Sequence, residues 1–386
     1  MTEEIFIRFV LDHEDEDSGR LLFSADRWPD IDVRRAARII EARRKIREKV
    51  PSWYAHPELD YPGSLPLEQC SSEATARYKQ SFVPRGGRIA DLTGGLGVDC
   101  WFLSRQAAEA HYCERSAELC AAARHNFAAL GGHIAVHEGD GIAWLQEQTG
   151  CFDLIYLDPA RRGKAGQRVY DIAGCEPNLL EIKDLLLSHA HRVLAKVSPM
   201  ADITRTLAQL PETRELHVVA TGGEVKELLI LLTRESTETP LIVAADDTQR
   251  FSFTPAEEHA ATVSYAETIG EYLFLPSKAV RKAGAFRLLS ERFDLAKLAP
   301  STHLYTAPTT VEGFPGKTYV VEDVLPWGNA AQRELRRRFD RLELATFNFP
   351  MSTDALRRRL GIPGGGGHYI AATALNNERI LIICKI

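Results

Sequence analysis

The chain has 386 residues, more than the ~250–300 residues at which a single hydrophobic core stops growing, so several structural units are expected. Hydrophobic residues make up 45% and charged residues 26% of the chain, proportions close to globular averages that exclude a disordered or fibrous protein. The formal net charge of −6 argues against a protein that coats nucleic acid through a positive field over its whole surface.

The sequence disfavours both membrane insertion and secretion. No run approaches the ~18 apolar residues of a membrane span, and residues 1–10 lack a basic region followed by a long apolar stretch. The seven cysteines are scattered, form no C-x-x-C pair and are expected to be reduced thiols, most of them in the core. We therefore expect a cytoplasmic protein that requires no metal ion.

The N-terminal part predicts helices. From Asp32 to Val50, apolar residues recur at helical spacing between arginines, and Pro51 ends the pattern. Prolines and a glycine then mark an irregular connection, before Ser71, Ser72 and Glu73 offer an N-cap for a further helix. These patterns predict a mainly helical unit over residues 1–68.

A second unit, over residues 69–235, alternates short apolar runs with helical patterns. The candidate strands cover residues 88–92, 110–114, 133–137, 153–157, 192–197, 216–220 and 227–233. Helical patterns fill the first five gaps, which is typical of right-handed βαβ units in a doubly wound parallel sheet. The last gap holds only residues 221–226, too few for a parallel crossover. The fold prediction is therefore an α/β Rossmann-like sheet that ends in an antiparallel hairpin, as in class I methyltransferases.

The remaining chain predicts two small α+β domains, over residues 236–316 and 317–386. Strand-like runs at 241–244, 272–275, 317–321 and 380–383 alternate with helical runs at 278–289, 330–339 and 353–360. Basic residues gather at 34–38, 43–45, 333–341 and 357–359, although the chain as a whole is acidic. Each such cluster is either a local basic face or a solvated helix surface.

The segment from residue 88 to residue 99 has the order strand, glycine turn and helix start. Thr93, Gly95 and Gly97 lie in the turn, where glycine permits a positive φ and a close approach to a ligand, and the helix N-terminus supplies free N–H groups. A dinucleotide fingerprint would need its third glycine at Cys100. Asp91, at the strand end, would repel a pyrophosphate but can pair with the positively charged amino acid portion of S-adenosylmethionine.

Two further acids follow the next two strands. Glu114 ends the second strand, where an acid can accept the ribose hydroxyls, although it is equally compatible with a surface carboxylate. Asp140 follows the third strand and is placed either to accept the adenine amino group or to cap the next helix, and both roles are compatible.

The fourth strand carries the strongest signal. It delivers Asp158 and Pro159 to the carboxyl edge of the sheet, where α/β sites form. Asp158 can orient the N–H of a nucleophile toward a methyl group and is also expected to contact the cofactor, and Pro159 stiffens the turn. Arg161 and Arg162 would then either face the substrate or form ordinary salt bridges.

Five segments together resemble the bacterial class I methyltransferases that carry ferredoxin-like and THUMP-like C-terminal domains. These segments are residues 64–76, 91–99, 158–162, 302–306 and 347–352. The resemblance covers almost the whole chain. It implies S-adenosylmethionine as cofactor, Ser71, Ser72 and Thr75 near the cofactor pocket, and RNA as the partner, bound through N- and C-terminal basic faces. The RNA inference is an analogy with THUMP modules.

The sequence departs from two related patterns. Amino-group methyltransferases often show a second proline and then an aromatic residue after the aspartate, whereas Ala160 and Arg161 stand here. RNA 5-methyluridine methyltransferases need a nucleophilic cysteine after the next strand, where this chain has residues 196–200 without one. We therefore expect direct in-line transfer to an N or O nucleophile. A methyltransferase acting on protein or a small molecule, and a non-catalytic RNA-binding protein, remain as alternatives.

Overall fold

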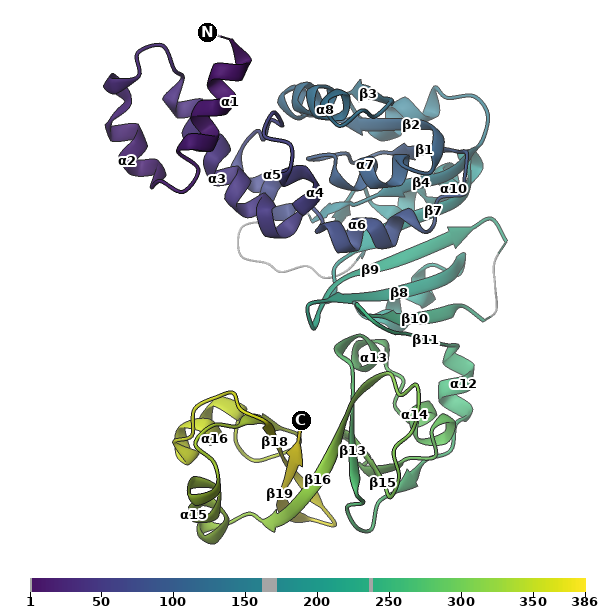
Figure 1. Ribbon diagram of the computed structural model, residues 1–386. Coiled ribbons are helices and arrows are strands. Elements are labelled where there is room, and N and C mark those ends of the chain that lie inside the picture. Colours follow the sequence, from purple (N-terminus) through teal and green to yellow (C-terminus); the bar gives the residue numbers. More distant parts are fainter. Residues whose placement is uncertain (1, 162–171, 236–238) are drawn as a thin grey trace. The chain divides into compact units, whose positions relative to one another are not determined.

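The computed structural model describes residues 2–161, 172–235 and 239–386 (Figure 1). The chain divides into two compact units, Met1–Glu215 with Lys226–Glu238, and Leu216–Val225 with Thr239–Ile386. Within the described ranges, no helix is both long and apolar enough to cross a membrane.

The first unit begins with helices. They are α1 (Glu3–Asp12), α2 (Ser18–Phe23), the short 3-10 helix η1 (Ala25–Arg27), α3 (Val33–Lys49), α4 (Pro51–Tyr54), α5 (Ser64–Gln69) and α6 (Glu73–Gln80). Helix α3 confirms the predicted amphipathic helix, and the Asp32 carboxylate caps it by accepting the Arg35 N–H. Pro51 also begins α4, because proline fits the first turn of a helix, where no N–H is needed.

Helix α3 joins two hydrophobic cores. Its first half packs Ala36 and Ile40 with α1 and α2. Its second half packs Ile46 in a cluster with Trp53, Tyr112 and other residues of the sheet and its helices. The second core therefore contains residues from both sides of position 68 in the chain.

The sheet of the first unit follows the predicted order. Its strands are β1 (Gly87–Asp91), β2 (Ala107–Glu114), β3 (Ile134–Glu138), β4 (Phe152–Leu157), β7 (Ala190–Val197) and β9 (Glu224–Thr233), preceded in the chain by β8 (Thr213–Thr221). The intervening helices are α7 (Val98–Ser104), α8 (Ala117–Ala129), α9 (Gly141–Gln146), α10 (Leu179–His189) and α11 (Ile203–Gln209). Among these strands, the order across the sheet is β8-β9-β7-β4-β1-β2-β3.

Strands β3, β2, β1, β4 and β7 are parallel to their neighbours, whereas β9 pairs antiparallel with β7. Strands β8 and β9 are consecutive across the turn that contains Gly222 and Gly223, both with positive φ. The predicted doubly wound sheet with an antiparallel hairpin at its end is thus confirmed.

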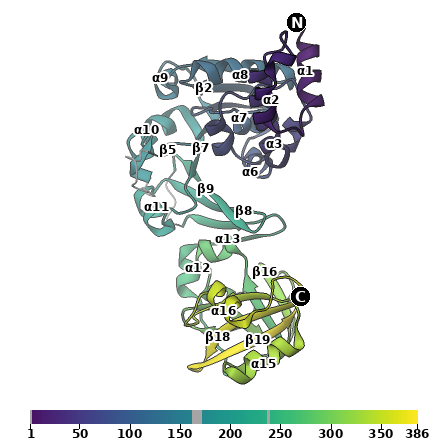
Figure 2. The ribbon, with the colours of Figure 1, turned by 90° about the vertical axis from the view of Figure 1, so that its left-hand side faces the viewer.

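Helices cover both faces of this sheet, as the two views show (Figures 1 and 2). Because side chains alternate along a strand, consecutive residues of β2 meet different helices. Tyr112 packs edge-on against Phe127 of α8, whereas His111 lies against Trp144 of α9. A minor pair, β5 (Ala160–Arg161) and β6 (Cys175–Glu176), and the 3-10 helix η2 (Ile172–Gly174) lie in the connection between β4 and α10.

Strand register aligns the polar strand ends. Asp91 is abreast of both Tyr112 in β2 and Tyr156 in β4, and Leu157 is abreast of Ala195 in β7. The next residues after the Leu157 and Ala195 pair are Asp158, which follows β4, and Lys196 in β7, so these two lie side by side. The carboxyl ends of the parallel strands therefore form one polar edge.

The second unit is α+β. Its eight-stranded sheet has the order β12-β14-β15-β13-β16-β19-β18-β17, and β10 pairs antiparallel with β11. The strands are β10 (Leu241–Ala245), β11 (Arg250–Phe253), β12 (Ser264–Tyr265), β13 (Tyr272–Pro276), β14 (Ala296–Ala299), β15 (Thr302–Ala307), β16 (Gly316–Pro326), β17 (Glu343–Thr346), β18 (His368–Leu375) and β19 (Glu378–Lys385). The helices are α12 (Pro255–Ala260), α13 (Lys278–Ala283), α14 (Arg287–Arg292), α15 (Asn329–Arg338) and α16 (Thr353–Leu360).

Two details of the second unit bear on the sequence predictions. The helical run expected at 278–289 is two helices, α13 and α14, because Gly284 adopts φ 88° and ends α13. The long strand β16 pairs with β13 through its first part and with β19 through its second part. The ranges of the four domains expected from the sequence stay predictions.

Candidate functional site

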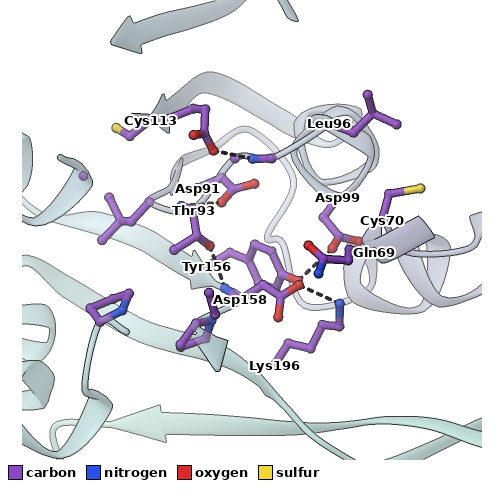
Figure 3. Close-up of a pocket in the computed structure, with 18 of the residues that line it drawn as sticks. Gln69, Cys70, Asp91, Thr93, Leu96, Asp99, Cys113, Tyr156, Asp158 and Lys196 are labelled. Carbon is purple, nitrogen blue, oxygen red and sulfur yellow. Dashed lines mark hydrogen bonds and ion pairs between the residues drawn. The ribbon is translucent and has the colours of Figure 1, made fainter. Parts of the chain in front are cut away.

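The strand ends of the first unit line a cavity of about 840 Å³, a size typical of small-molecule sites. Its wall includes nine of the residues predicted from sequence: Ser71, Asp91, Thr93, Gly95, Gly97, Glu114, Asp140, Asp158 and Pro159. Figure 3 shows how several of these side chains converge from separate strands. The predicted polar edge of the sheet is therefore a single concave site.

Among the described residues, the Asp91 carboxylate has no cation as an ion-pair partner. Its side chain is buried, with 1% of its surface exposed, and Oδ1 accepts the N–H of Thr93 at 3.0 Å. Oδ2 is buried and accepts no hydrogen bond from any described residue. Burial, aided by the negative charges of Asp99, Asp158 and Glu114, raises the pKa of Asp91 well above the ordinary range of an aspartate. A buried oxygen in this state fits a site that receives a positively charged ligand group.

The glycine turn has separate packing and access requirements. A Cβ on Gly94 would lie 2.1 Å from the ring of Tyr112, and one on Gly97, at φ 88°, would lie 2.8 Å from Phe127. Gly95, at φ 55°, has no atom closer than 3.9 Å to the place of its missing Cβ. Gly94 and Gly97 therefore permit close packing of the turn on the sheet, whereas Gly95 leaves open space in the cavity wall.

Glu114 is fixed by the backbone. Its Oε2 accepts the N–H of Gly95 at 2.9 Å, and its Oε1 accepts the N–H of Ser116 at the same distance. Each carboxylate oxygen can accept a second hydrogen bond. The carboxylate thus holds the glycine turn in place and still has capacity to accept hydroxyl groups of a ligand.

Asp140 caps α9, as one of its two predicted roles requires. Its Oδ1 accepts the N–H groups of Ile142 and Ala143 at 2.8 and 3.1 Å, and its Oδ2 pairs with the Arg115 guanidinium. Although burial acts in the opposite direction, these contacts hold the pKa of Asp140 below its usual range. Arg115 also donates to Glu176 at 3.1 Å, so one guanidinium joins two acids at this rim.

Asp158 is held from both sides. Its backbone N–H donates to Thr93 Oγ1 at 2.6 Å, which ties β4 to the glycine turn. Its Oδ2 accepts a hydrogen bond from Lys196 Nζ at 2.6 Å (Figure 3). Burial lowers the pKa of Lys196, but Asp158, Asp99 and Glu227 outweigh it and raise that pKa above its ordinary value. Lys196 is therefore an ammonium in the cavity wall.

A buried charge cluster lies beneath this pair. Lys79 is fully buried, and its Nζ contacts Asp99 Oδ1 at 3.0 Å, Glu227 Oε1 at 2.9 Å and Ser71 Oγ at 2.9 Å. Ser71 and Tyr156 both donate to Asp99 Oδ2, at 2.7 and 2.8 Å. The ammonium thus forms ion pairs with two carboxylates and donates hydrogen bonds to Ser71 Oγ and to Glu227 Oε2, the latter at 3.0 Å, as a buried charge requires.

The acids of this cluster differ in their electrostatics. Burial raises the pKa of Asp99, but Lys79, Lys196 and the two hydroxyl donors outweigh it and hold that pKa below its ordinary value. For Glu227, burial outweighs the two lysines and raises the pKa. The cluster therefore fixes the position of Asp99 in the cavity wall as a charged group.

Three predicted residues are not placed in the cavity wall. Ser72 Oγ accepts the N–H of Thr75 and caps α6, and Thr75 Oγ1 donates to the carbonyl of Ser72, so the structure gives both a capping role. The backbone of Arg161 belongs to β5. Arg162 lies outside the described residues, and the predicted contacts of both arginines stay predictions.

The sequence reasoning missed Lys196 and the buried pair formed by Lys79 and Glu227. Lys196 lies within residues 196–200, a stretch that bears on the prediction only because it lacks a nucleophilic cysteine. Lys79 and Glu227 belong to no local sequence motif. The register of β4 and β7 could have indicated Lys196, because it follows the strand adjacent to Asp158. The pairing of Lys79 with Glu227 joins residues 148 positions apart and had no signal in the sequence.

Both basic regions contain ion pairs. In the N-terminal helices, the buried Arg43 pairs with Glu14, and Arg35 and Lys45 pair with Glu3 and Glu68. In the C-terminal helices, Arg337, Arg338 and Arg357 pair with Glu334, Asp323 and Glu343, whereas Arg333 and Arg358 are exposed. Helices α15 and α16 contain more arginines than acids, so their surface is positive.

Comparisons with known proteins follow the same domain pattern. Residues 272–315 match a model described as a ferredoxin-like domain, and residues 316–385 match one described as THUMP domain-like. A crystal structure described as a "putative methyltransferase from Porphyromonas gingivalis W83" is 34% identical, covers 100% of this chain and 99% of that chain, and has a TM-score of 0.90. The chain belongs to this methyltransferase family. The predicted family resemblance, with its two C-terminal domains, is thereby confirmed.

More distant structures match parts of the chain. A Streptococcus mutans "putative methyltransferase" in complex with SAH is 13% identical, covers 42% of this chain and 96% of that chain, and has a TM-score of 0.32. An rRNA methylase from Streptococcus thermophilus is 12% identical, with 42% and 94% coverage and the same TM-score of 0.32. Similarities at this level support no conclusion about the present chain. No curated protein matches the chain.

Proposed function

We propose that this protein is an S-adenosylmethionine-dependent methyltransferase. The observation that carries the proposal is Asp91 Oδ2, a buried carboxylate oxygen beside an open glycine turn that accepts no hydrogen bond from the part of the chain that the structure describes. A buried acid of this kind is costly unless a cation joins it. The α-ammonium group of S-adenosylmethionine is such a cation, and a dinucleotide pyrophosphate is not.

The other cavity residues suit the remaining parts of the same cofactor. Glu114 would accept the ribose hydroxyls, and Asp140 would accept the adenine amino group, while Thr93, Gly95 and Gly97 would line its path. When bound, the cofactor supplies an electrophilic methyl group on a sulfonium. Ser71 supports the wall indirectly, through its hydrogen bond to Asp99.

The acceptor would enter at the β4 and β7 end of the cavity. The order β7-β4-β1-β2-β3 separates Asp158 and Lys196 from the three acids that suit the cofactor. Asp158 would orient an N or O nucleophile, with Pro159 fixing the turn, and transfer would be direct, without a covalent enzyme intermediate. We propose Arg161 as a further substrate contact.

RNA is the proposed acceptor molecule. The THUMP-like match over residues 316–385 and the positive surface of α15 and α16 support this part of the proposal. A cytoplasmic location belongs to the same proposal.

Calorimetry with S-adenosylhomocysteine and with NAD tests the cofactor, and mass spectrometry of RNA nucleosides from cells with and without the gene tests the substrate. We expect binding of S-adenosylhomocysteine alone, and at least one methylated nucleoside that disappears with the gene. Asp158→Asn should bind the cofactor product but fail to restore that nucleoside. Absence of S-adenosylhomocysteine binding by the intact protein would refute the cofactor assignment.

A further inference from the structure

Lys196 occupies the end of the cavity that the proposed cofactor contacts do not use. Its side chain is 16% exposed and that of Asp158 is 36% exposed, so both reach the open cavity. Lys196 Nζ holds Asp158 Oδ2, and no described residue donates a hydrogen bond to Oδ1. An acceptor at this end therefore meets an ammonium and a free carboxylate oxygen side by side.

This pair favours one kind of nucleophile. An amine that attacks a methyl group develops positive charge on its nitrogen, and an ammonium beside it raises the energy of that transition state. A hydroxyl that attacks loses its proton, so its oxygen gains negative character, which the same ammonium stabilises. A carboxylate without a neighbouring cation would instead suit an amine.

The ammonium is also held firmly in place. Lys196 lies on β7 between β4 and β9, where Leu229 is its register partner, and the negative charges of Asp99 and Glu227 act on it. A donor that is fixed before the reaction stabilises developing charge without reorganisation. The acids of the Lys79 cluster therefore stabilise the Lys196 ammonium together with Asp158.

We propose that the methyl acceptor is a hydroxyl group, and on RNA the ribose 2′-hydroxyl, with Lys196 as the catalytic residue that stabilises its oxygen. The inference rests on the proposed function and narrows its acceptor from N or O to O. The 2′-hydroxyl is the nucleophilic hydroxyl that every internal nucleotide of RNA presents.

The methyl transfer forms one bond and breaks one. The hydroxyl oxygen forms a bond to the methyl carbon of S-adenosylmethionine, the carbon–sulfur bond breaks, and its electron pair stays on sulfur as the neutral thioether. The hydroxyl proton passes to Asp158 Oδ1 and then to solvent. Lys196 donates one N–H to Asp158 Oδ2 and another to the reacting oxygen throughout.

The test uses the intact protein, radiolabelled S-adenosylmethionine and total RNA from cells that lack the gene. Alkali cleaves RNA through the 2′-hydroxyl, so a 2′-O-methyl group leaves its label in alkali-resistant dinucleotides. We expect the label there. Label in alkali-released mononucleotides would overturn the hydroxyl inference but would agree with the proposed function as an RNA methyltransferase. Absence of label from RNA would overturn both, while S-adenosylhomocysteine binding would still report separately on the cofactor assignment.

Variants of Lys196 test its role. Lys196→Met should lower kcat about 100- to 1,000-fold, as expected for loss of a donor to a developing oxyanion, and should leave S-adenosylhomocysteine affinity within a factor of two or so. Lys196→Arg should restore part of kcat. Unchanged kcat in Lys196→Met would overturn the role.

Lys183→Met is the matched control. Lys183 also forms an ion pair with a carboxylate, Glu212, but it lies outside the cavity wall. We expect its kcat to equal that of the wild type. If both lysine variants lose kcat equally, the effect reflects lost ion pairing in general, and the specific role of Lys196 is refuted.

Discussion

At the residue scale, Asp91 couples ligand binding to protons. Its pKa is raised by burial, so the folded chain binds this proton more tightly than the unfolded chain does. Stability is then lost as pH rises from the ordinary aspartate pKa toward the raised one. A ligand ammonium favours the ionised form, so S-adenosylhomocysteine should bind more tightly as pH rises over the same window.

Asp91→Asn separates these effects. Without ligand at neutral pH, we expect a higher Tm than that of the wild type in calorimetry, because the buried acid is gone. The same variant should lose S-adenosylhomocysteine affinity by about 1.5–3 kcal/mol, the range for a hydrogen bond to a charged group. Binding of 5′-methylthioadenosine, which lacks the amino acid portion, serves as the control and should change little. A lower Tm and unchanged affinity would contradict the assignment.

At the element scale, the glycine turn makes different demands at neighbouring positions. In Gly94→Ala the new methyl group meets the Tyr112 ring at 2.1 Å, so we expect a loss of stability of about 1–3 kcal/mol, typical of overpacking. Gly95→Ala meets no close atom and should cost about 1–2 kcal/mol for its left-handed backbone. The ratio of binding free energy lost to unfolding free energy lost should be larger for Gly95→Ala than for Gly94→Ala, because only Gly95 leaves open space in the cavity wall. Denaturant titration and calorimetry measure the two quantities.

Helix α6 distinguishes a cap from a ligand contact. Ser72 Oγ accepts the Thr75 N–H at the start of α6, so Ser72→Ala should lower the free energy of unfolding by about 1 kcal/mol. Because the cavity wall includes Ser71 but not Ser72, S-adenosylhomocysteine affinity should stay at the wild-type value. A tenfold weaker affinity in Ser72→Ala would instead support the cofactor contact expected from the sequence.

At the scale of the whole molecule, an acidic chain can bind RNA only through a local surface. Arg333, Arg341 and Arg358 of the C-terminal region are exposed. Replacing all three by Glu in the full-length protein should flatten the salt dependence of RNA binding, since each lost phosphate contact removes a log–log slope of about 0.7. Fluorescence anisotropy over a salt series measures the slope, and S-adenosylhomocysteine affinity should not change.

The matched variant makes the same charge change in the N-terminal helical region, at the exposed residues Arg8, Arg20 and Arg27. It should keep the wild-type slope. Equal flattening in both variants would mean that net charge, and not the α15 and α16 surface, governs binding. Truncation is a poorer test, because β16 also pairs with β13, and its removal would leave one edge of β13 unpaired.

The sequence by itself determined the order of elements and the acids of the site. Period-two and helical patterns located each strand and helix of the sheet, and the six-residue gap at 221–226 required an antiparallel hairpin. Asp91, Glu114 and Asp158 were recognisable because each follows a strand, and parallel strands bring their carboxyl ends to one edge. These features depend on local pattern and on a general rule of sheet topology.

Only the tertiary structure decided which charges meet. Lys196 reaches Asp158 through the register of β4 and β7, and Lys79 reaches Glu227 across 148 positions of the chain. The structure also divided Ser71, which supports Asp99, from Ser72, which caps α6, although the two are adjacent in sequence. Pairing between distant side chains depends on packing and burial, because a charge without a partner is tolerated in water and costly in a core. Local patterns carry no information on that choice.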